Sequence, residues 1–332
     1  MEKRYIIGID QSTQGTKALL FDGVGHLLRR TDLPHRQIVN EKGWVSHDLN
    51  EIYRNTVQTV KTLVAESGVA PETIAGIGIS NQRETTAIWD KATGEPLEEA
   101  IVWQCGRASG IAQEIAEQGH AEEIREATGL QLSAYFPAAK MAWLLRNGGE
   151  ERQKRAADGK LCLGTIDSWL VYKLTGDHAF KTDFSNASRT QLFNLKTLAW
   201  DEKICEIFGI PACALARVCN SDAVYGATTM EGLFSEPVPI CGVLGDSHAA
   251  LFGQGCLKPG MIKATYGTGS SLMMNIGDKP IKSSHGVVTS LAWGRGGKVD
   301  YVLEGNLNYT GAVITWLKDD LKLISSAKET EG

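Results

Sequence analysis

Two short polar segments of the chain have the composition of phosphate-binding turns. The first, residues 10–16 (DQSTQGT), follows the apolar run 5–9, and the second, residues 267–270 (GTGS), follows the run 261–266. Small Ser, Thr and Gly residues leave backbone N–H groups open to a ligand and add hydroxyl donors, which suits phosphate oxygens. Taken singly, each segment is also typical of an ordinary hairpin turn.

Two charged residues beside the first segment favour a nucleotide phosphate. Asp10 stands at the end of the expected strand, where its carboxylate can hold a magnesium ion through water, and Lys17 adds a positive charge. The matched pair of segments predicts a nucleotide gripped from both sides of a cleft between two domains. The sequence has neither a P-loop motif nor the GxGxxG dinucleotide fingerprint, so those two modes of nucleotide binding are excluded.

The overall composition excludes several classes of protein. Of the 332 residues, 42% are hydrophobic and 22% are charged, which is close to the average for globular proteins and unlike disordered or collagen-like chains. The formal net charge of -5 argues against a protein that binds DNA or RNA. No apolar stretch is long enough to span a bilayer, and the start of the chain lacks the apolar segment of a secretory signal. We therefore expect a cytoplasmic protein with no nucleic-acid partner and no membrane partner.

The cysteines predict neither disulfides nor a zinc site. There are 7 of them, an odd number, and no two form a Cys-x-x-Cys pair. We expect buried free thiols, as in a reducing cytoplasm.

Alternating strands and helices must position the polar segments. Residues 5–9, 17–21 and 27–28 predict a β-meander, and further strands are expected at 74–79, 161–164 and 240–244. Helices are predicted from Asp48 to about Gly68, over much of 105–160, over 167–174 and over 247–253. This alternation indicates an α/β architecture.

Near residue 255 the opening pattern of strand, small polar turn and strand begins again. The repeat predicts a duplicated domain, with one domain over residues 1–254 and a second over 255–332. The second domain is expected to be incomplete, because few residues remain for its sheet and covering helices. Trp316 and Leu317 are then expected among the apolar groups left uncovered, which invites self-association.

Several blocks of the sequence resemble the FGGY family of carbohydrate kinases and, within it, the glycerol kinases. The blocks are residues 81–86 (NQRETT), 100–104 (AIVWQ), 164–170 (GTIDSWL), 185–190 (SNASRT), 245–246 (GD), 249–254 (AALFGQ) and 265–269 (TYGTG). They occur in register over nearly the whole chain. The resemblance implies the actin/Hsp70/sugar-kinase ATPase fold with ribonuclease H-like domains. Members of the family continue well beyond this length, into a glycine-rich segment that grips adenosine.

The resemblance implies transfer of the γ-phosphoryl group of ATP to a hydroxyl of a small polyol, first of all glycerol to glycerol 3-phosphate. Asp246 would be the general base, and a carboxylate suits this role because proton loss comes late in a loose phosphoryl transfer. Without the resemblance, Asp246 would be read as a helix N-cap. Arg83 and Glu84 would offer the polyol a fixed donor beside a fixed acceptor.

The complete set of predicted site residues follows from the two turns and the resemblance. The predicted substrate-binding residues are Arg83, Glu84, Trp103, Tyr135, Asp246 and Ser247. The predicted phosphate-binding residues are Asp10, Gln11, Ser12, Thr13, Lys17, Gly267, Thr268 and Gly269. Asp10 and Asp246 are expected to hold Mg²⁺ through water, so ATP and Mg²⁺ are the predicted cofactors. A homo-oligomer, dimer or tetramer, is also expected.

The chain departs from the glycerol kinase pattern at four positions. Lys17 stands where an Arg is usual, which keeps the charge but loses the bidentate fork. Ser247-His248 replaces Gln-Gln, and Ser271 replaces a Phe of the substrate wall. The two serines predict a roomier and more polar pocket, and His248 is either an extra contact for a longer substrate or an ordinary helix residue. A loss of fit at this scale is enough to shift substrate preference about tenfold.

Three alternatives remain open at this point. The first is a kinase of the same family that acts on a four- or five-carbon polyol or ketose. The second is an actin-like or chaperone-like protein, which uses the nucleotide as a switch and has no polyol clamp. The third is an inactive shortened chain that binds ATP weakly or not at all.

Overall fold

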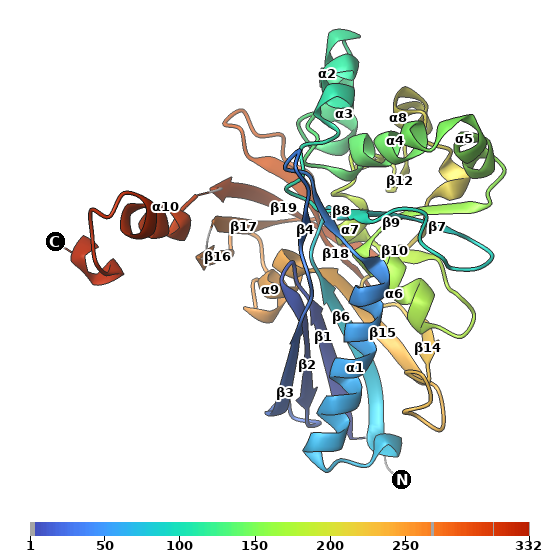
Figure 1. Cartoon of the computed structure of the whole chain (residues 1–332), viewed down its shortest axis with the longest axis vertical. Helices are drawn as coiled ribbons and strands as arrows, with labels where there is room; N and C mark the ends of the chain where they lie inside the picture. Colours follow the sequence, from blue (N-terminus) through green and yellow to red (C-terminus); the bar gives the residue numbers. More distant parts are fainter. Residues whose placement is uncertain (1–3, 267–268, 308, 332) are drawn as a thin grey trace.

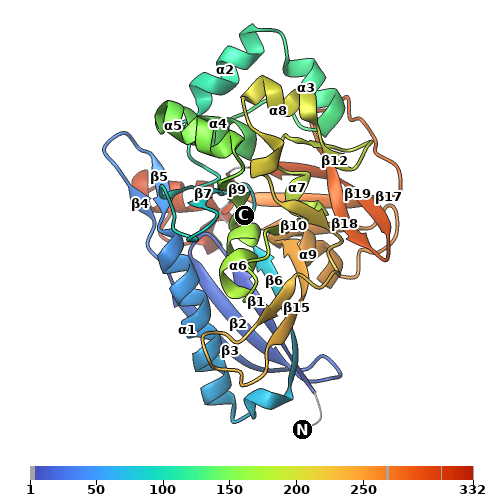
Figure 2. The same cartoon turned by 90° about the vertical axis from the view of Figure 1, so that its right-hand side faces the viewer.

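The first large sheet of the protein has six strands in the order β14-β15-β6-β1-β2-β3 (Figures 1 and 2). In this computed structural model, which describes residues 4–266, 269–307 and 309–331, the strands are β1 (Tyr5–Gln11), β2 (Gly15–Phe21), β3 (Leu27–Pro34), β6 (Ile74–Asn81), β14 (Gly226–Thr228) and β15 (Val238–Gly245). Strands β1, β2 and β3 form an antiparallel meander, as predicted, whereas β6 runs parallel to both β1 and β15. The carboxyl ends of β1, β6 and β15 therefore meet at one edge.

Helix α1 (Leu49–Ser67) covers one face of this sheet, and local signals define both of its ends. The Asp48 carboxylate accepts from the Asn50 N–H at 2.8 Å, and Gly68 ends the helix with a φ of 70°. Both ends lie at the predicted residues. An N-cap carboxylate and a left-handed glycine end helices because they satisfy backbone groups that the helix leaves unpaired. The helix packs against β2 and β3, with Val57, Val60 and Val64 buried.

A second layer stands above the carboxyl edge and consists of a smaller sheet and a group of helices (Figure 1). The five-stranded sheet contains β4 (Ile38–Val39), β5 (Val45–His47), β7 (Thr86–Asp90), β8 (Ala100–Ile101) and β9 (Leu161–Thr165). The helices are α2 (Ser109–Glu117), α3 (Ala121–Thr128), α4 (Pro137–Asn147), α5 (Gly149–Ala157) and α8 (Glu202–Phe208). The prediction of a largely helical stretch over 105–160 is confirmed.

Short elements connect this layer to the first sheet. They are η1 (Pro71–Thr73), α6 (Ile166–Leu174), β10 (Lys181–Asp183), α7 (Phe184–Ala187), β11 (Phe193–Asn194), β12 (Ala199–Trp200), η2 (Ala212–Ala214) and β13 (Arg217–Cys219). Helix α6 contacts both β6 and β15, so it packs on the sheet whose strand ends build the site.

A second sheet follows with the order β16-β17-β19-β18. Its strands are β16 (Ile262–Tyr266), β17 (Ser270–Gly277), β18 (Val288–Arg295) and β19 (Lys298–Leu307). Strands β16 and β17 pair antiparallel, which confirms the second predicted hairpin. Helix α9 (Asp246–Gly253) contacts strands of both large sheets and lies between them (Figure 2).

The second sheet packs directly on the segment that follows α7. Leu291 and Tyr301 are buried in one cluster with Ala187, Phe193 and Leu195. The division of the chain at residue 255 stays a prediction, but strands β18 and β19 clearly share a core with residues N-terminal to it.

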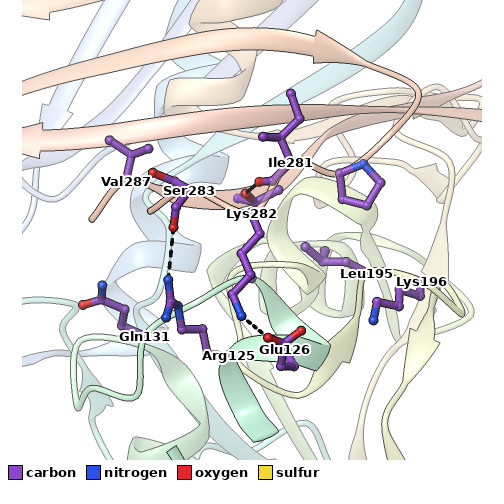
Figure 3. A pocket seen from close by; sticks show the side chains of 12 residues that line it. Arg125, Glu126, Gln131, Leu195, Lys196, Ile281, Lys282, Ser283 and Val287 are labelled. Carbon is purple, nitrogen blue, oxygen red and sulfur yellow. Dashed lines mark hydrogen bonds and ion pairs between the residues drawn. The ribbon is translucent and has the colours of Figure 1, made fainter. Parts of the chain in front are cut away.

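The loop between β17 and β18 is also bound to helix α3 (Figure 3). Arg125 donates to the Ser283 carbonyl at 3.0 Å, and Lys282 pairs with Glu126. A cavity of about 130 Å³ lies between the two segments. These contacts hold the second sheet against the helical layer.

The last described segment stands apart from the rest of the chain (Figure 1). It contains α10 (Gly311–Thr315), a π-helical turn (Trp316–Asp320) and η4 (Ala327–Thr330). Trp316 is 49% exposed, as predicted, whereas Leu317 is half-buried. Among the described residues, no helix is both long and apolar enough to cross a membrane.

The cysteines are free, as predicted, but not all of them are buried. Cys105, Cys162, Cys205 and Cys256 lie in the interior, whereas Cys213 and Cys241 are exposed and Cys219 is half-buried. The prediction of burial was therefore wrong for three positions: Cys213 lies in the short turn η2, Cys219 ends β13, and Cys241 lies at an irregularity in the pairing of β15.

Candidate functional site

The site lies where β1, β6 and β15 end side by side. The register pairs Gln11 with Asn81 and Asn81 with Gly245, so the three strands end next to one another and the residues that follow them lie at the same edge of the sheet. Asp10 pairs with Ser80 one position earlier. The parallel strands thus bring the first polar turn, Arg83 and Asp246 to the same edge of the sheet.

Asp246 is the first residue of α9 and its carboxylate remains accessible. The N-cap is Gly245, which rules out the reading of Asp246 as the cap. The Asp246 side chain is 43% exposed, and its Oδ1 lies 3.3 Å from the Arg83 Nε. Desolvation and the nearby Glu84 charge raise the pKa of Asp246, while Arg83 opposes them. A carboxylate that is held by a cation and still open to a ligand is suited to accept a proton.

Arg83 is almost completely buried beneath the end of β15. Its two Nη atoms donate to the two Glu304 carboxylate oxygens at 2.9 and 2.7 Å. A Cβ atom on Gly245 would stand 2.8 Å from the Arg83 Cγ and Cδ atoms. Only glycine therefore leaves room for this arginine at the strand end.

Glu84 and Arg189 complete a buried network of charges. The Arg189 Nε donates to the Glu84 Oε1 at 2.6 Å, and its Nη1 lies 2.8 Å from the Glu304 Oε2. Desolvation alone would raise the pKa of Glu304, but the charges of Arg189 and Arg83 outweigh it and hold this pKa well below its usual range. Each acidic side chain of this buried network therefore faces an arginine, which is the arrangement that buried ion pairs require.

The backbone of Glu84 has an unusual conformation. Its φ is 61°, in the left-handed region that residues other than glycine rarely adopt. Such a conformation persists only where the surroundings hold it, and it is concentrated at functional sites. It directs the Glu84 carboxylate away from the strand and toward Arg189.

Trp103 and Tyr135 form an aromatic wall beside this network. Their rings meet edge to face with centroids 5.8 Å apart, and both side chains are half-buried. The Trp103 Nε1 donates to the Thr13 Oγ1 at 3.0 Å. The aromatic wall and the first polar turn are therefore in direct contact.

The first polar turn is held by its own hydrogen bonds. Asp10 accepts from the Lys17 Nζ at 2.9 Å and from the Ser80 Oγ at 3.2 Å. The Ser12 N–H and Oγ both donate to the Gly15 carbonyl, at 2.9 and 3.0 Å.

Gln11, by contrast, is completely buried and accepts from the Gln82 side chain at 3.0 Å. Its side chain thus braces the turn from below instead of facing a ligand. Of the second turn, Gly267 and Thr268 lie outside the described residues, and Gly269 is half-buried.

Of the four positions that depart from the glycerol kinase pattern, Ser247, His248 and Ser271 differ from one another in burial and in hydrogen bonding. Ser247 is half-buried beside Asp246, and the Ser271 Oγ donates to the Glu304 Oε1 at 3.3 Å. His248 is completely buried, and neither ring nitrogen has a hydrogen-bond partner in the described part of the chain. His248 therefore does not offer a contact to a longer substrate, and of its two readings the structure supports an interior helix residue.

Sequence reasoning missed Arg189 and Glu304. Arg189 stands in one of the matched blocks, and Glu304 directly follows the apolar run 301–303, which was the available signal. Their partners lie 105 and 221 residues away, so only the tertiary structure reveals the network.

No group of three or more metal-ligating side chains occurs in the described residues. Asp10 and Asp246 are close enough that the charge of Asp10 helps to raise the pKa of Asp246. Two carboxylates near the polar turn fit a Mg²⁺ ion that keeps several waters and takes its other ligands from phosphates.

Comparisons with known proteins agree with this geometry. Residues 5–253 match the N-terminal domain of the FGGY family of carbohydrate kinases, and residues 262–332 match its C-terminal domain. The chain is 47% identical over 328 residues to glycerol kinase 2 of Thermotoga maritima and 46% identical over 331 residues to the glycerol kinase of Bacillus licheniformis. These alignments cover 99% and 100% of this chain but only 66% of either relative.

Solved structures show the same fold. The crystal structure of Plasmodium falciparum glycerol kinase with ADP has a TM-score of 0.90 and 34% identity, and the match covers 99% of this chain and 66% of that chain. A ligand-bound xylulose kinase from Lactobacillus acidophilus has a TM-score of 0.84 at 24% identity over 96% of this chain and 62% of that chain, and it supports the fold alone.

Proposed function

Because the chain belongs to the FGGY family of carbohydrate kinases, we propose that it transfers the γ-phosphoryl group of ATP to a hydroxyl of a small polyol, first of all glycerol. The chain spans about two thirds of the length of the curated relatives that it matches, 66% in each case. The observation that carries the proposal is the accessible Asp246 carboxylate, held 3.3 Å from the Arg83 guanidinium at the carboxyl edge of the sheet.

In the proposed reaction Asp246 accepts the proton of the attacking hydroxyl. The polyol oxygen forms a bond to the γ-phosphorus while the bond to the bridging oxygen of ADP breaks. The proton moves to Asp246, whose raised pKa favours its acceptance. In a loose transition state this transfer comes late, so Asp246 mainly orients the hydroxyl.

Glu84 and the aromatic wall are proposed to bind the polyol. Arg189 holds one oxygen of the Glu84 carboxylate, which fixes the direction in which the group accepts from polyol hydroxyls. Arg83 already donates to Glu304 with both Nη atoms, so its main role is to orient Asp246. Trp103 and Tyr135 would pack against the carbon atoms of the substrate.

The phosphates and the metal ion are proposed to lie over the first polar turn. The hydrogen bond from Trp103 to Thr13 places the first polar turn beside the aromatic wall. Ser12 and Lys17 belong to the same hairpin. Asp10 and Asp246 would hold Mg²⁺ through water. When bound, the ion neutralises charge on the phosphate oxygens.

A four- or five-carbon polyol or ketose is the second candidate substrate. Ser271 has turned toward Glu304, and Ser247 is small, so neither side chain fills the volume that Gln and Phe would take. Phosphorylation rates for glycerol, erythritol, ribitol and ribulose separate the two candidates. A faster rate with glycerol supports the first, and a rate at least about tenfold higher with a longer substrate supports the second.

Release of ADP that depends on the polyol is the experiment that tests the proposed function. ADP is measured with and without each substrate, and binding of the polyol and of ATP is measured separately by calorimetry. Nucleotide hydrolysis that ignores every polyol would favour a conformational switch protein over a kinase. A chain that binds polyol but not ATP would identify an inactive substrate-binding portion. Assembly into a dimer or tetramer stays a prediction, to be tested by light scattering.

A further inference from the structure

Lys140 is a fully buried lysine in the interior of helix α4. Its side chain is 0% exposed, and its helix neighbours Ala138, Ala139, Met141 and Ala142 are buried apolar residues. A lysine is almost never fully buried without a partner for its charge. No carboxylate forms an ion pair with it among the residues that the structure describes.

The ammonium group of Lys140 instead donates to three backbone carbonyls. The Nζ lies 3.2 Å from the Trp103 carbonyl and 3.4 Å from the Glu84 carbonyl, and it also bonds the Tyr135 carbonyl. An ammonium has three donors and no acceptor, so the group and its surroundings match in number. A neutral amine, with two N–H groups, could make only two of these three hydrogen bonds.

The three carbonyls belong to the residues that we propose to contact the polyol. Glu84 follows β6, Trp103 follows β8, and Tyr135 precedes α4, so three separate chain segments converge on one ammonium. Glu84 and Trp103 are 56 and 37 residues from Lys140 in the chain.

The contact with Glu84 has a further consequence. Its backbone is in the left-handed region, with a φ of 61°, and needs external support to remain there. The Glu84 carbonyl accepts from Lys140 and from the Thr86 Oγ1 at 3.1 Å. Both bonds hold the peptide in the orientation that directs the Glu84 side chain to Arg189.

The burial of Lys140 has a cost that is set against its three hydrogen bonds. Desolvation lowers the pKa of Lys140 to about 7, while the Glu84 carboxylate acts in the opposite direction. Leucine or methionine would avoid this desolvation but would leave the three carbonyls without the Lys140 donor. The three hydrogen bonds from one buried side chain therefore point to a function that depends on where the three carbonyls lie.

We propose that Lys140 is a positioning residue of the polyol site, whose ammonium sets the mutual placement of Glu84, Trp103 and Tyr135. The proposal rests on the proposed function, because it assumes that these three side chains contact a polyol. Lys140 itself does not touch the substrate.

The test compares Lys140→Met, Lys140→Gln and a matched control. Methionine keeps the length without donors, and glutamine keeps an amide with two donors. The control is Lys181→Met, because the Lys181 Nζ also donates to backbone carbonyls, those of Tyr225 at 2.9 Å and Val224 at 3.4 Å, away from the site. The full chain is labelled with 5-fluorotryptophan, and Trp103→Phe and Trp200→Phe assign the two reference signals in the ¹⁹F spectrum.

We expect Lys140→Met to move the Trp103 signal and leave the Trp200 signal in place. Titration with glycerol should give a Kd at least about tenfold weaker than that of the parent chain, with Lys140→Gln in between and Lys181→Met unchanged. Folded Lys140 variants with the parent Trp103 signal and the parent Kd would overturn the proposal. The proposal would also be overturned if both Lys140 variants unfold while Lys181→Met folds, because the role of Lys140 would then be structural only.

Failure of the proposed function gives a different result. If the parent chain binds none of the polyols, the substrate assignment is wrong, whereas the shift of the Trp103 signal still reports whether Lys140 positions the aromatic wall.

Discussion

Arg83 and Glu304 form a two-pronged ion pair across 221 residues of sequence, with N–O distances of 2.9 and 2.7 Å. Arg83 follows β6 of the first sheet, and Glu304 lies in β19 of the second. The same guanidinium holds Asp246 through its Nε. The proposed catalytic carboxylate is therefore tied to both sheets through one side chain.

Loss of the Glu304 charge should destabilise the protein strongly. Glu304→Gln leaves Arg83 and Arg189 facing each other in the interior without their shared carboxylate, and breaking a buried ion pair costs about 3–5 kcal/mol. Urea denaturation measures the free energy of unfolding. The control is Glu66→Gln, whose exposed pair with Arg29 should be worth less than about 1 kcal/mol. Equal effects of the two substitutions would contradict the buried network.

Replacement of the proposed general base should separate binding from chemistry. Asp246→Asn removes the proton acceptor but keeps the size of the side chain, so we expect kcat to fall by about 100- to 10,000-fold. The glycerol Kd should change far less. Asp278→Asn, at an exposed position just after β17, serves as the control. Retention of full turnover by Asp246→Asn would remove this residue from the mechanism.

A single added methyl group at Gly245 should displace Arg83. The new Cβ would stand 2.8 Å from two carbon atoms of that side chain, which is too close for any real contact. We expect Gly245→Ala to lower kcat/KM by at least about tenfold, since the guanidinium can no longer hold Asp246 in place. Gly253→Ala should retain activity, because its new Cβ would meet no described atom within 4 Å apart from its chain neighbours and its own helix backbone. Steady-state kinetics of both variants provide the comparison.

The stability of the fold should decrease in acid because of a buried histidine pair. His47 packs against His35 with ring centroids 4.5 Å apart, and desolvation together with His35 lowers the pKa of His47 to about 4. In the unfolded chain this pKa returns to about 6.5. Between those values the unfolded state binds the extra proton, so stability is lost as the pH falls from about 6.5 to 4, by about 3 kcal/mol.

The measurement is the free energy of unfolding in urea as a function of pH. His47→Gln should flatten the curve in this range, whereas His26→Gln, at a largely exposed site, should follow the parent. A parent curve without any slope between pH 4 and 6.5 would show that His47 is not held neutral.

The elements of the fold were predictable where the determining interactions are local. The Asp48 cap and the Gly68 end of α1 depend on groups within a turn of the helix, and both were found at the predicted residues. The two hairpins with their polar turns follow from strand and turn composition in the same way. Asp246, which would be read as an N-cap without the family resemblance, is instead the first residue of α9, because Gly245 is the cap.

The sequence by itself determined the α/β class, the two polar turns, the family resemblance and the chemical types gathered for a polyol and a phosphate. Only the tertiary structure decided which charges meet: Arg83 with Glu304, Glu84 with Arg189, and Lys140 with three carbonyls. It also turned Gln11 inward, against its predicted role as a phosphate contact, and of the two readings of His248 it supports the interior helix residue. The physical reason is that strand and turn propensities act over a few residues, whereas the pairing of buried charges depends on which segments the parallel register brings together.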